Sequence, residues 1–224
     1  MDRQLITAKS KSNSSANKKK EQGLGTRQDI MTAAEYVFFD KGVAATTLEL
    51  IAEKANVTRG AIYWHFKNKN QLLEQVIDGA IIPLLDSFRE ALIGTSSPGI
   101  DQLRKASIEI ISDIIHSPSH QRRLAIALLK CEYTSEFAHL TERHVNYHEE
   151  IREVLITYLT KIAASQDMLF RSPSLIAESI LFYYTGLLTQ FLKHPDKINL
   201  QQDLSDYIDI FINSILSKQA EKTP

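Results

Sequence analysis

The residues with the most potential for chemistry run from Asn56 to Lys69 and read Asn-Val-Thr-Arg-Gly-Ala-Ile-Tyr-Trp-His-Phe-Lys-Asn-Lys. The hydroxyl of Thr58 can cap the N-terminus of a helix, and Ile62 and Phe66 then form a narrow apolar seam at helical spacing. The remaining surface of this short helix is aromatic, cationic and rich in hydrogen-bonding groups. A partner that offers many acceptors and phosphates, such as the groove of a nucleic acid, matches that surface.

The segment before this stretch predicts a second helix and a tight turn. Thr46 to Glu49 reads as a capping box, in which the Thr46 hydroxyl and the Glu49 carboxylate satisfy backbone donors at the helix start. Asn56 in the turn can take the left-handed conformation that glycine often fills. An apolar stripe at i, i+3, i+4 and i+7 links the cap to the turn: Leu48, Ile51, Ala52 and Ala55. The pair of helices is therefore predicted to be a helix-turn-helix, the phosphates and base edges of duplex DNA being its target.

Gly42 to Leu73 resembles the DNA-binding domain of the TetR family of transcriptional regulators, and Val57 to Lys69 is similar in particular to the multidrug-efflux repressors of that family. Lys130-Cys131-Glu132-Tyr133 also resembles a run that those repressors carry. The resemblance implies an all-α homodimer that binds double-stranded operator DNA and responds to a small-molecule effector. It further implies phosphate contacts from Arg27, Thr47, Tyr63 and Lys69, base-edge positions for Thr58, Arg59, Gly60, Trp64 and His65, and a DNA-facing cation at Lys67. Chemistry agrees, because arginine suits a bidentate contact with guanine and glycine lets a helix approach the groove.

Composition and charge fit this interpretation. The chain has 224 residues and a single cysteine, Cys131, so it cannot form an internal disulfide. Residues 1–70 carry 12 Lys and Arg against 7 Asp and Glu, a net charge of +5, whereas residues 71–224 carry 14 against 20, a net charge of −6. Charges interrupt the apolar stretches, so no membrane span is expected and the cytoplasm is the expected location.

Apolar residues at helical spacing recur along the whole chain, and no strand-like alternation is present, so the fold class is predicted to be all-α with about nine helices. We expect a disordered basic tail over 1–25, a helix-turn-helix domain over 26–70 and a ligand-binding and dimerisation domain over 71–219. Within the first domain, Thr26 is expected to cap a helix from Arg27 to Lys41. A long helix from about residue 70 to 93 joins the two folded domains, and Pro83 inside it predicts either a bend near Gly79 or a helix end.

The second domain is expected to enclose a largely apolar pocket for a hydrophobic effector. Its predicted wall takes the inward stripe of each helix: Ala106, Ile110, Leu124, Leu128, His148, Ile151, Leu155, Leu181, Tyr184, Thr185 and Leu188. No Arg or Lys lies on this wall, and its polar groups are expected to be Tyr184, Thr185 and His148. The helix around Gly186 is apolar nearly all round, which indicates burial on more than one side and favours a dimer interface over a monomer core.

Other functions have weaker support in the sequence. His139, His144 and His148 with Glu149 share helical spacing but lack a His-Glu-x-x-His run and a third ligand, so a solvated or pocket-wall role is favoured over a metal site. No nucleophile arrangement or phosphate-binding glycine loop is present, so neither an enzyme nor a cofactor is expected. The alternatives are a TetR-type regulator of lipid or aromatic metabolism, an architectural DNA-binding protein without ligand response, and a helical carrier. The sequence does not identify the operator, the target genes or the effector.

Overall fold

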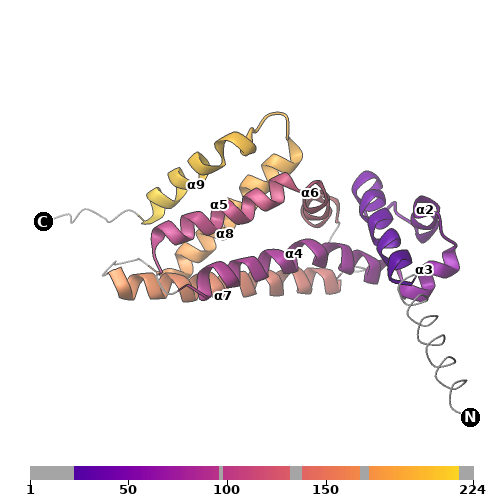
Figure 1. The fold of residues 1–224 in the computed structure, drawn as a ribbon, viewed down its shortest axis with the longest axis horizontal. Coiled ribbons are helices and arrows are strands. Elements are labelled where there is room, and N and C mark those ends of the chain that lie inside the picture. Colours follow the sequence, from indigo (N-terminus) through magenta and orange to yellow (C-terminus); the bar gives the residue numbers. More distant parts are fainter. Residues whose placement is uncertain (1–22, 96–97, 132–137, 167–171, 217–224) are drawn as a thin grey trace, which may run out of the picture. The chain divides into compact units, whose positions relative to one another are not determined.

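A computed structural model describes residues 23–95, 98–131, 138–166 and 172–216, and within them every regular element is a helix (Figure 1). This confirms the all-α prediction. The elements are the first helix (residues 23–41), α2 (Leu48–Lys54), α3 (Arg59–His65), α4 (Lys69–Ile93), α5 (Ile100–His116), α6 (Pro118–Ala125), the π-helix η1 (Ile126–Lys130), α7 (Ala138–Gln166), α8 (Pro173–Lys193) and α9 (Leu200–Leu216).

The described residues fall into two compact units that divide inside α4, between Val76 and Ile77. The division was expected at residue 70, before that helix. The first unit is a three-helix domain completed by the first two turns of α4. Its centre is formed by fully buried side chains from every one of these helices: Ile30, Ala34, Phe38, Ile51, Ile62, Phe66, Leu72 and Val76.

The N-terminal boundary of the first unit differs from the expectation. Residues 23–25 already belong to the first helix, so Thr26 does not cap it, and the rest of the expected tail lies outside the described residues. The helix ends as predicted at Gly42, whose φ of 79° favours a residue without a Cβ. At the other end of the unit, the Asn68 side chain caps α4 by accepting a hydrogen bond from Gln71 N at 2.8 Å.

The N-cap of α2 is one residue later than the predicted capping box placed it. Thr47 is the N-cap and accepts from Leu50 N at 3.3 Å. Thr46 is 1% exposed, and its hydroxyl donates to the Gly42 carbonyl at 2.7 Å, so it ties the turn to the end of the first helix. Glu49 therefore does not close a box with Thr46.

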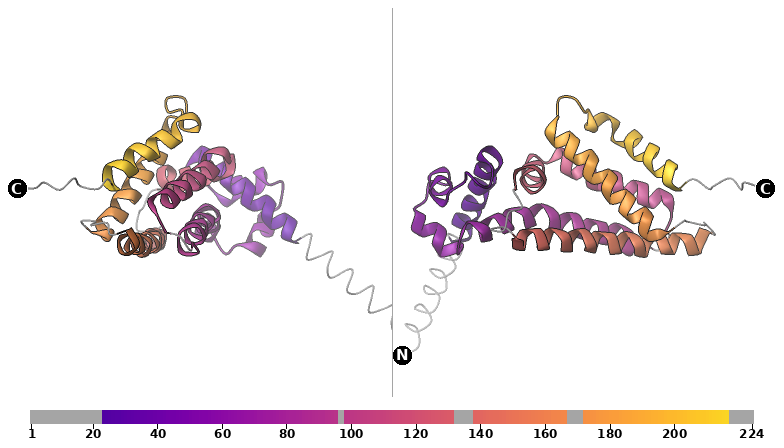
Figure 2. Two further views of the ribbon diagram at one scale, coloured as in Figure 1. Left: turned by 60° about the vertical axis from the view of Figure 1, so that its left-hand side comes forward. Right: turned by 180° about the vertical axis from the view of Figure 1, so that it is seen from behind.

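The second unit is a bundle in which α5 packs against α9 and α7 packs against α8. Figures 1 and 2 show α4 and α7 running side by side along its length. Tyr158 of α7 is completely buried, and its hydroxyl donates to the Gly99 carbonyl at 2.9 Å, so it fixes the start of α5. Ser172 caps α8 as its Ser-Pro sequence predicts. By length and composition α8 could cross a membrane, but it packs on α7 and contributes seven buried side chains to the bundle.

The α-helix that contains Leu124 is short. Ser117 and Pro118 start α6, as a serine followed by proline predicts, but from Ile126 to Lys130 the chain winds as one turn of π-helix, and Cys131 is already extended. In a π-helix the hydrogen bonds span five residues rather than four, which rotates the side chains that follow. Glu132 and Tyr133, the other half of the Lys-Cys-Glu-Tyr run, lie outside the described residues.

Pro83 does not end α4, which continues to Ile93. Proline has no N–H to donate to the Gly79 carbonyl one turn earlier. That carbonyl instead accepts a hydrogen bond from the Arg123 guanidinium of α6 at 3.1 Å. A Cβ on Gly79 would lie 2.5 Å from the same guanidinium nitrogen, so the contact depends on glycine at this position.

Candidate nucleic-acid interface and effector cavity

The turn between α2 and α3 has the geometry that the sequence predicts. Asn56 has a φ of 53°, and Val57 N donates to the Ala52 carbonyl at 3.0 Å, which brings the chain back across the end of α2. Thr58 then caps α3 by accepting from Ala61 N at 3.2 Å. A left-handed residue that is not glycine is uncommon, and asparagine tolerates it best. The local sequence therefore accounts for the tight turn that joins the two helices.

The buried and exposed faces of α3 separate as predicted. Ile62 is fully buried and Phe66 is 2% exposed, whereas Trp64 is 84% exposed and Tyr63 is 47% exposed. An indole turned fully to solvent does not stabilise the folded unit. The exposed face of α3 thus carries its large aromatic groups where a partner can reach them.

Of the ten predicted DNA-binding residues, seven are exposed, at the start of α2, on α3 and just after it: Thr47, Thr58, Arg59, Gly60, Tyr63, Trp64 and Lys67. Gly60 is informative among them, because a Cβ added there would come no closer than 3.8 Å to a neighbouring atom, the Thr58 hydroxyl. Packing within the unit does not require glycine at that position. A close approach by an external surface is a reason that remains.

The other three, Arg27, His65 and Lys69, are half-buried. Arg27 donates to the Gln75 side chain and lies with its guanidinium carbon 5.2 Å from the centre of the Phe66 ring. Lys69 Nζ donates to the Val43 carbonyl at 3.0 Å. In the free protein both cations therefore brace the unit, and the sequence-based assignment had given them only a phosphate role.

Arg59 also has internal partners that the sequence did not indicate. Its guanidinium makes an ion pair with Glu49 at 2.6 Å and donates to the Tyr63 hydroxyl at 3.0 Å. Since Arg59 and Glu49 stand near the first turns of two different helices, their proximity is a consequence of the helix crossing and could not be read from spacing along the chain.

The second unit contains a cavity of about 390 Å³ with an almost entirely apolar lining. Nine of the eleven predicted wall residues line it: Ile110, Leu124, Leu128, His148, Ile151, Leu181, Tyr184, Thr185 and Leu188. Ala106 and Leu155 are buried in the same bundle but do not line the cavity. Both residues lie on the buried face of their helices, as predicted, but their side chains pack in the bundle core and do not border the cavity.

The lining also includes residues that the sequence analysis missed. They are Ile81, Leu84 and Phe88 of α4, Ile111 and Ile114 of α5, Tyr147 of α7 and Phe182 of α8. Apolar residues occupy a wide face of α4, and which part of that face borders the cavity depends on how α7 and α8 cross it. Phe182 is 65% exposed and lies near His148, with the ring centres 6.5 Å apart, so this pair stands at an opening of the cavity.

The polar groups of the cavity are largely occupied. Tyr184 donates its hydroxyl hydrogen to Ser107 Oγ at 2.7 Å. This donor is therefore already used, although the sequence analysis counted Tyr184 among the polar groups of the pocket wall. Burial raises the pKa of Tyr184 well above the ordinary tyrosine value, and the hydroxyl stays protonated. Tyr147 donates to Asp78 at 2.9 Å and accepts from Arg143 at 3.0 Å. Thr185 and His148 are the other polar residues of the lining.

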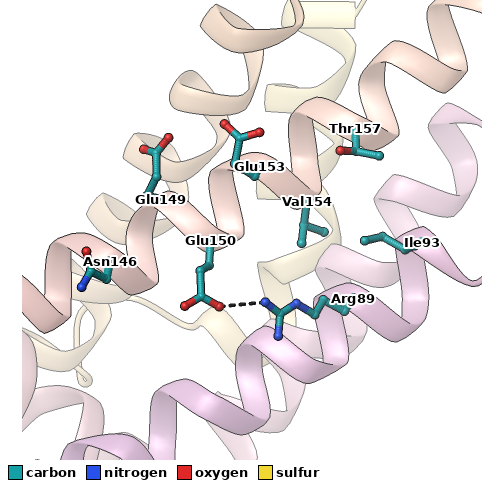
Figure 3. Close-up of a pocket in the computed structure, with 8 residues that line it drawn as sticks. All are labelled: Arg89, Ile93, Asn146, Glu149, Glu150, Glu153, Val154 and Thr157. Carbon is teal, nitrogen blue, oxygen red and sulfur yellow. Dashed lines mark hydrogen bonds and ion pairs between the residues drawn. The ribbon is translucent and has the colours of Figure 1, made fainter.

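A second, open groove of about 510 Å³ runs along α4 and α7 (Figure 3). Six of its eight lining residues are polar or charged, and its carboxylates have cationic partners. Glu150 pairs with Arg89 at 2.7 Å, and Glu149 and Glu153 both pair with Arg152. Among the side chains that the structure describes, no group of three metal-ligating residues comes together; the side chains of His139 and His144 lie outside them. The apolar cavity is the better candidate for a hydrophobic ligand.

Comparisons with known proteins place both units. Residues 30–76 match the family model "Bacterial regulatory proteins, tetR family", and residues 98–217 match "MAATS-type transcriptional repressor, C-terminal region". The chain is 31% identical over 202 residues to the transcriptional regulator TtgR of Pseudomonas putida, covering 85% of this chain and 91% of TtgR. It is 27% identical to AcrR of Shigella flexneri, covering 90% and 94%.

A solved structure gives the same result. NalD, the secondary repressor of the MexAB-OprM multidrug efflux pump in Pseudomonas aeruginosa, matches with a TM-score of 0.79 and 26% identity, over 87% of this chain and 98% of NalD. These relatives are transcriptional regulators and not enzymes. The two family models together span most of the chain, and they match the units that hold the helix-turn-helix and the cavity. The chain therefore belongs to the TetR family of transcriptional repressors.

Proposed function

We propose that this protein is a ligand-responsive repressor that binds a palindromic operator as a homodimer, controls a multidrug-efflux operon in the bacterial cytoplasm and releases DNA when a hydrophobic small molecule fills its cavity. The observation that carries the proposal is the apolar cavity, because part of its wall belongs to α4. Only three residues separate the end of α3 from the start of the same helix. A ligand that repacks the wall therefore acts on the helix that follows the DNA-reading element.

The chemistry of the cavity defines the class of effector. No Lys, Arg, Asp or Glu belongs to its described lining, so an ionised ligand would lose hydration without gaining a charge partner. Burial of apolar area, at about 25 cal/mol per Å², would supply most of the affinity. Two orienting polar groups discriminate poorly between ligands of similar size. Several unrelated neutral, hydrophobic compounds should therefore act on the protein, as multidrug control requires.

Homodimer formation is supported by the apolar surface of the last two helices. Leu175 and Phe182 of α8 and Ile210 of α9 are between 55% and 70% exposed. A Cβ added to Gly186 would meet no atom within 4 Å, so packing inside the protomer does not require glycine there. A second copy packed closely on α8 would account for both features. Two-fold symmetry would place two reading helices about 34–36 Å apart, one DNA turn.

Control of lipid or aromatic metabolism is the alternative within the family, since an apolar cavity also suits an acyl chain or an aromatic ring. The two cases differ in breadth of response. A metabolic regulator would answer one class of molecule, whereas an efflux regulator would answer structurally unrelated ones. An architectural DNA-binding protein would answer none and would bind many sequences alike.

The test is an electrophoretic mobility shift with the DNA upstream of the protein's own gene and a scrambled duplex of equal length, in the presence of several neutral drugs, a fatty acid and a small hydrophilic anion. Release by unrelated neutral compounds at micromolar concentration supports the proposal. Leu128→Arg should abolish release and leave DNA binding intact, and Val145→Arg, on an exposed site of α7 outside the cavity, should change neither. Release by the anion alone would contradict the multidrug role.

A further inference from the structure

We propose that Glu49 limits the specificity of the DNA-reading surface, because its carboxylate holds Arg59 in the free protein and has to release it before Arg59 can bind a base that offers an equivalent pair of acceptors. The inference rests on the proposed DNA binding and adds a residue that neither the sequence pattern nor the family's DNA contacts had suggested.

The contact itself lies on the surface that would face DNA. Arg59 at the start of α3 and Glu49 in the first turn of α2 are joined at 2.6 Å, and their side chains are 58% and 54% exposed. An exposed ion pair adds little to folding stability, because water solvates both partners well. The pair is therefore not required to hold the two helices together, and a different role has to explain why a carboxylate stands on a surface that would meet phosphates.

Arg59 is held from two sides. One terminal nitrogen contacts Glu49, and the other donates to the Tyr63 hydroxyl at 3.0 Å, with the guanidinium carbon 5.4 Å from the centre of the Tyr63 ring. The planar group is thus oriented before any partner arrives. Such an orientation reduces the entropy that an arginine loses when it forms two parallel hydrogen bonds.

Glu49 interacts with two side chains that are predicted to contact DNA, Arg59 and Thr47. Its pKa lies below the ordinary value because its own backbone N–H donates to the carboxylate, and the charge of Arg59 and the hydroxyl of Thr47 add to the effect. The group is therefore an anion at neutral pH. Thr47 was predicted to contact a phosphate and Arg59 a base, so Glu49 occupies, in the free protein, the positions that acceptors of the DNA would take.

The bases differ in how well they can take the place of Glu49 as the partner of Arg59. Guanine presents O6 and N7 together in the major groove and can accept two hydrogen bonds from one guanidinium, whereas adenine and thymine each present one acceptor there and cytosine presents only a donor. Only guanine fully compensates Arg59 for the loss of the carboxylate. At a wrong base Arg59 remains with Glu49 and keeps neutralising its charge, whereas at guanine the released carboxylate is left unpaired beside the phosphates. Glu49 should consequently weaken binding to the operator more than binding to random DNA, because only operator binding breaks the ion pair.

The experiment compares Glu49→Gln with Glu53→Gln, which removes the same charge one turn along α2 at another exposed site. Dissociation constants are measured by fluorescence anisotropy for a duplex selected by the wild-type protein from a random pool and for its scrambled version. Glu49→Gln should tighten binding to the selected duplex and raise the ratio of the scrambled to the selected dissociation constant by about 3- to 10-fold. Glu53→Gln should leave that ratio unchanged. Thermal melts show whether each variant is folded.

A second background distinguishes a role through Arg59 from a general charge effect. In Arg59→Ala protein the Glu49→Gln change should no longer alter the ratio, because the group that Glu49 holds is missing. Equal tightening of both duplexes by Glu49→Gln and Glu53→Gln, or an undiminished effect without Arg59, would overturn the role of Glu49 and leave the repressor proposal in place. A wild-type protein that selects no sequence at all would instead refute the repressor proposal, and this inference with it.

Discussion

Arg123→Ala is expected to destabilise the second unit because it removes the donor that replaces the missing N–H of Pro83. The Gly79 carbonyl would then lack its partner inside a partly buried helix contact. A hydrogen bond to a charged group contributes about 1.5–3 kcal/mol, and solvent access places this one near the lower end, at about 1–2 kcal/mol. For a chain of this length such a loss lowers the melting temperature by roughly 2–8 °C.

A double-mutant cycle with Pro83→Ala isolates this contact from the other interactions of Arg123. Alanine at position 83 restores an N–H one turn after Gly79, so the carbonyl regains a partner within α4. Pro83→Ala alone should raise stability, since proline inside a helix is unfavourable by up to about 3 kcal/mol relative to alanine. In that background the loss caused by Arg123→Ala should fall to about half or less.

The assay is urea unfolding of the four proteins, followed by the ligand concentration that releases half of the DNA. We expect Pro83→Ala and Arg123→Ala to shift that concentration, because both alter the hold of α6 on the helix that lines the cavity. If Arg123→Ala lowered the unfolding free energy by the same amount with and without Pro83, the Arg123 guanidinium would not be replacing the missing N–H of residue 83. Unchanged release curves in folded variants would show that the contact is structural only.

The remaining predictions concern the two sites. Gly60→Ala should fold at least as stably as the wild type, because a Cβ fits there, and should lose operator affinity in a mobility shift; full affinity would remove the argument for close approach. Arg59→Ala should relax base preference at one position of each half-site, whereas Lys67→Ala should weaken all sequences alike and reduce the salt dependence by about one phosphate contact. Because burial raises the pKa of Tyr184, its contribution to stability is present below the unfolded tyrosine value and is lost as pH rises above about 10. Urea unfolding from pH 9 to 11 should therefore show a shallower decline in Tyr184→Phe, and an identical decline would contradict that assignment.

The sequence allowed the helices to be predicted where a local signal defines them. Ser117 and Ser172, each followed by proline, mark helix starts that the structure reproduces, and Gly42 marks an end. Thr46 and Thr47 show the limit of such signals, because either hydroxyl can cap a helix and only the packing of the first helix buries Thr46. The capping position therefore depends on tertiary structure.

Long-range contacts could not be predicted in the same way. The donor for the Gly79 carbonyl comes from a residue 44 positions away, so proline alone could indicate only a bend or an end. The inward stripes of α5, α7 and α8 gave most of the cavity wall, because apolar periodicity marks the buried face of each helix. Periodicity does not tell a side chain packed against a neighbour from one that borders empty space, and Leu155 was assigned to the wall for that reason.

The π-turn from Ile126 to Lys130 has a consequence for how ligand range can change within such regulators. Leu128 lies in this turn and lines the cavity. Deleting one residue here would let the segment wind as ordinary α-helix and would rotate every later side chain in it by about 100°. A single codon lost or gained would thus change which side chain of this turn faces the cavity, without any substitution. The wall of the cavity can diversify by insertion and deletion as well as by point mutation.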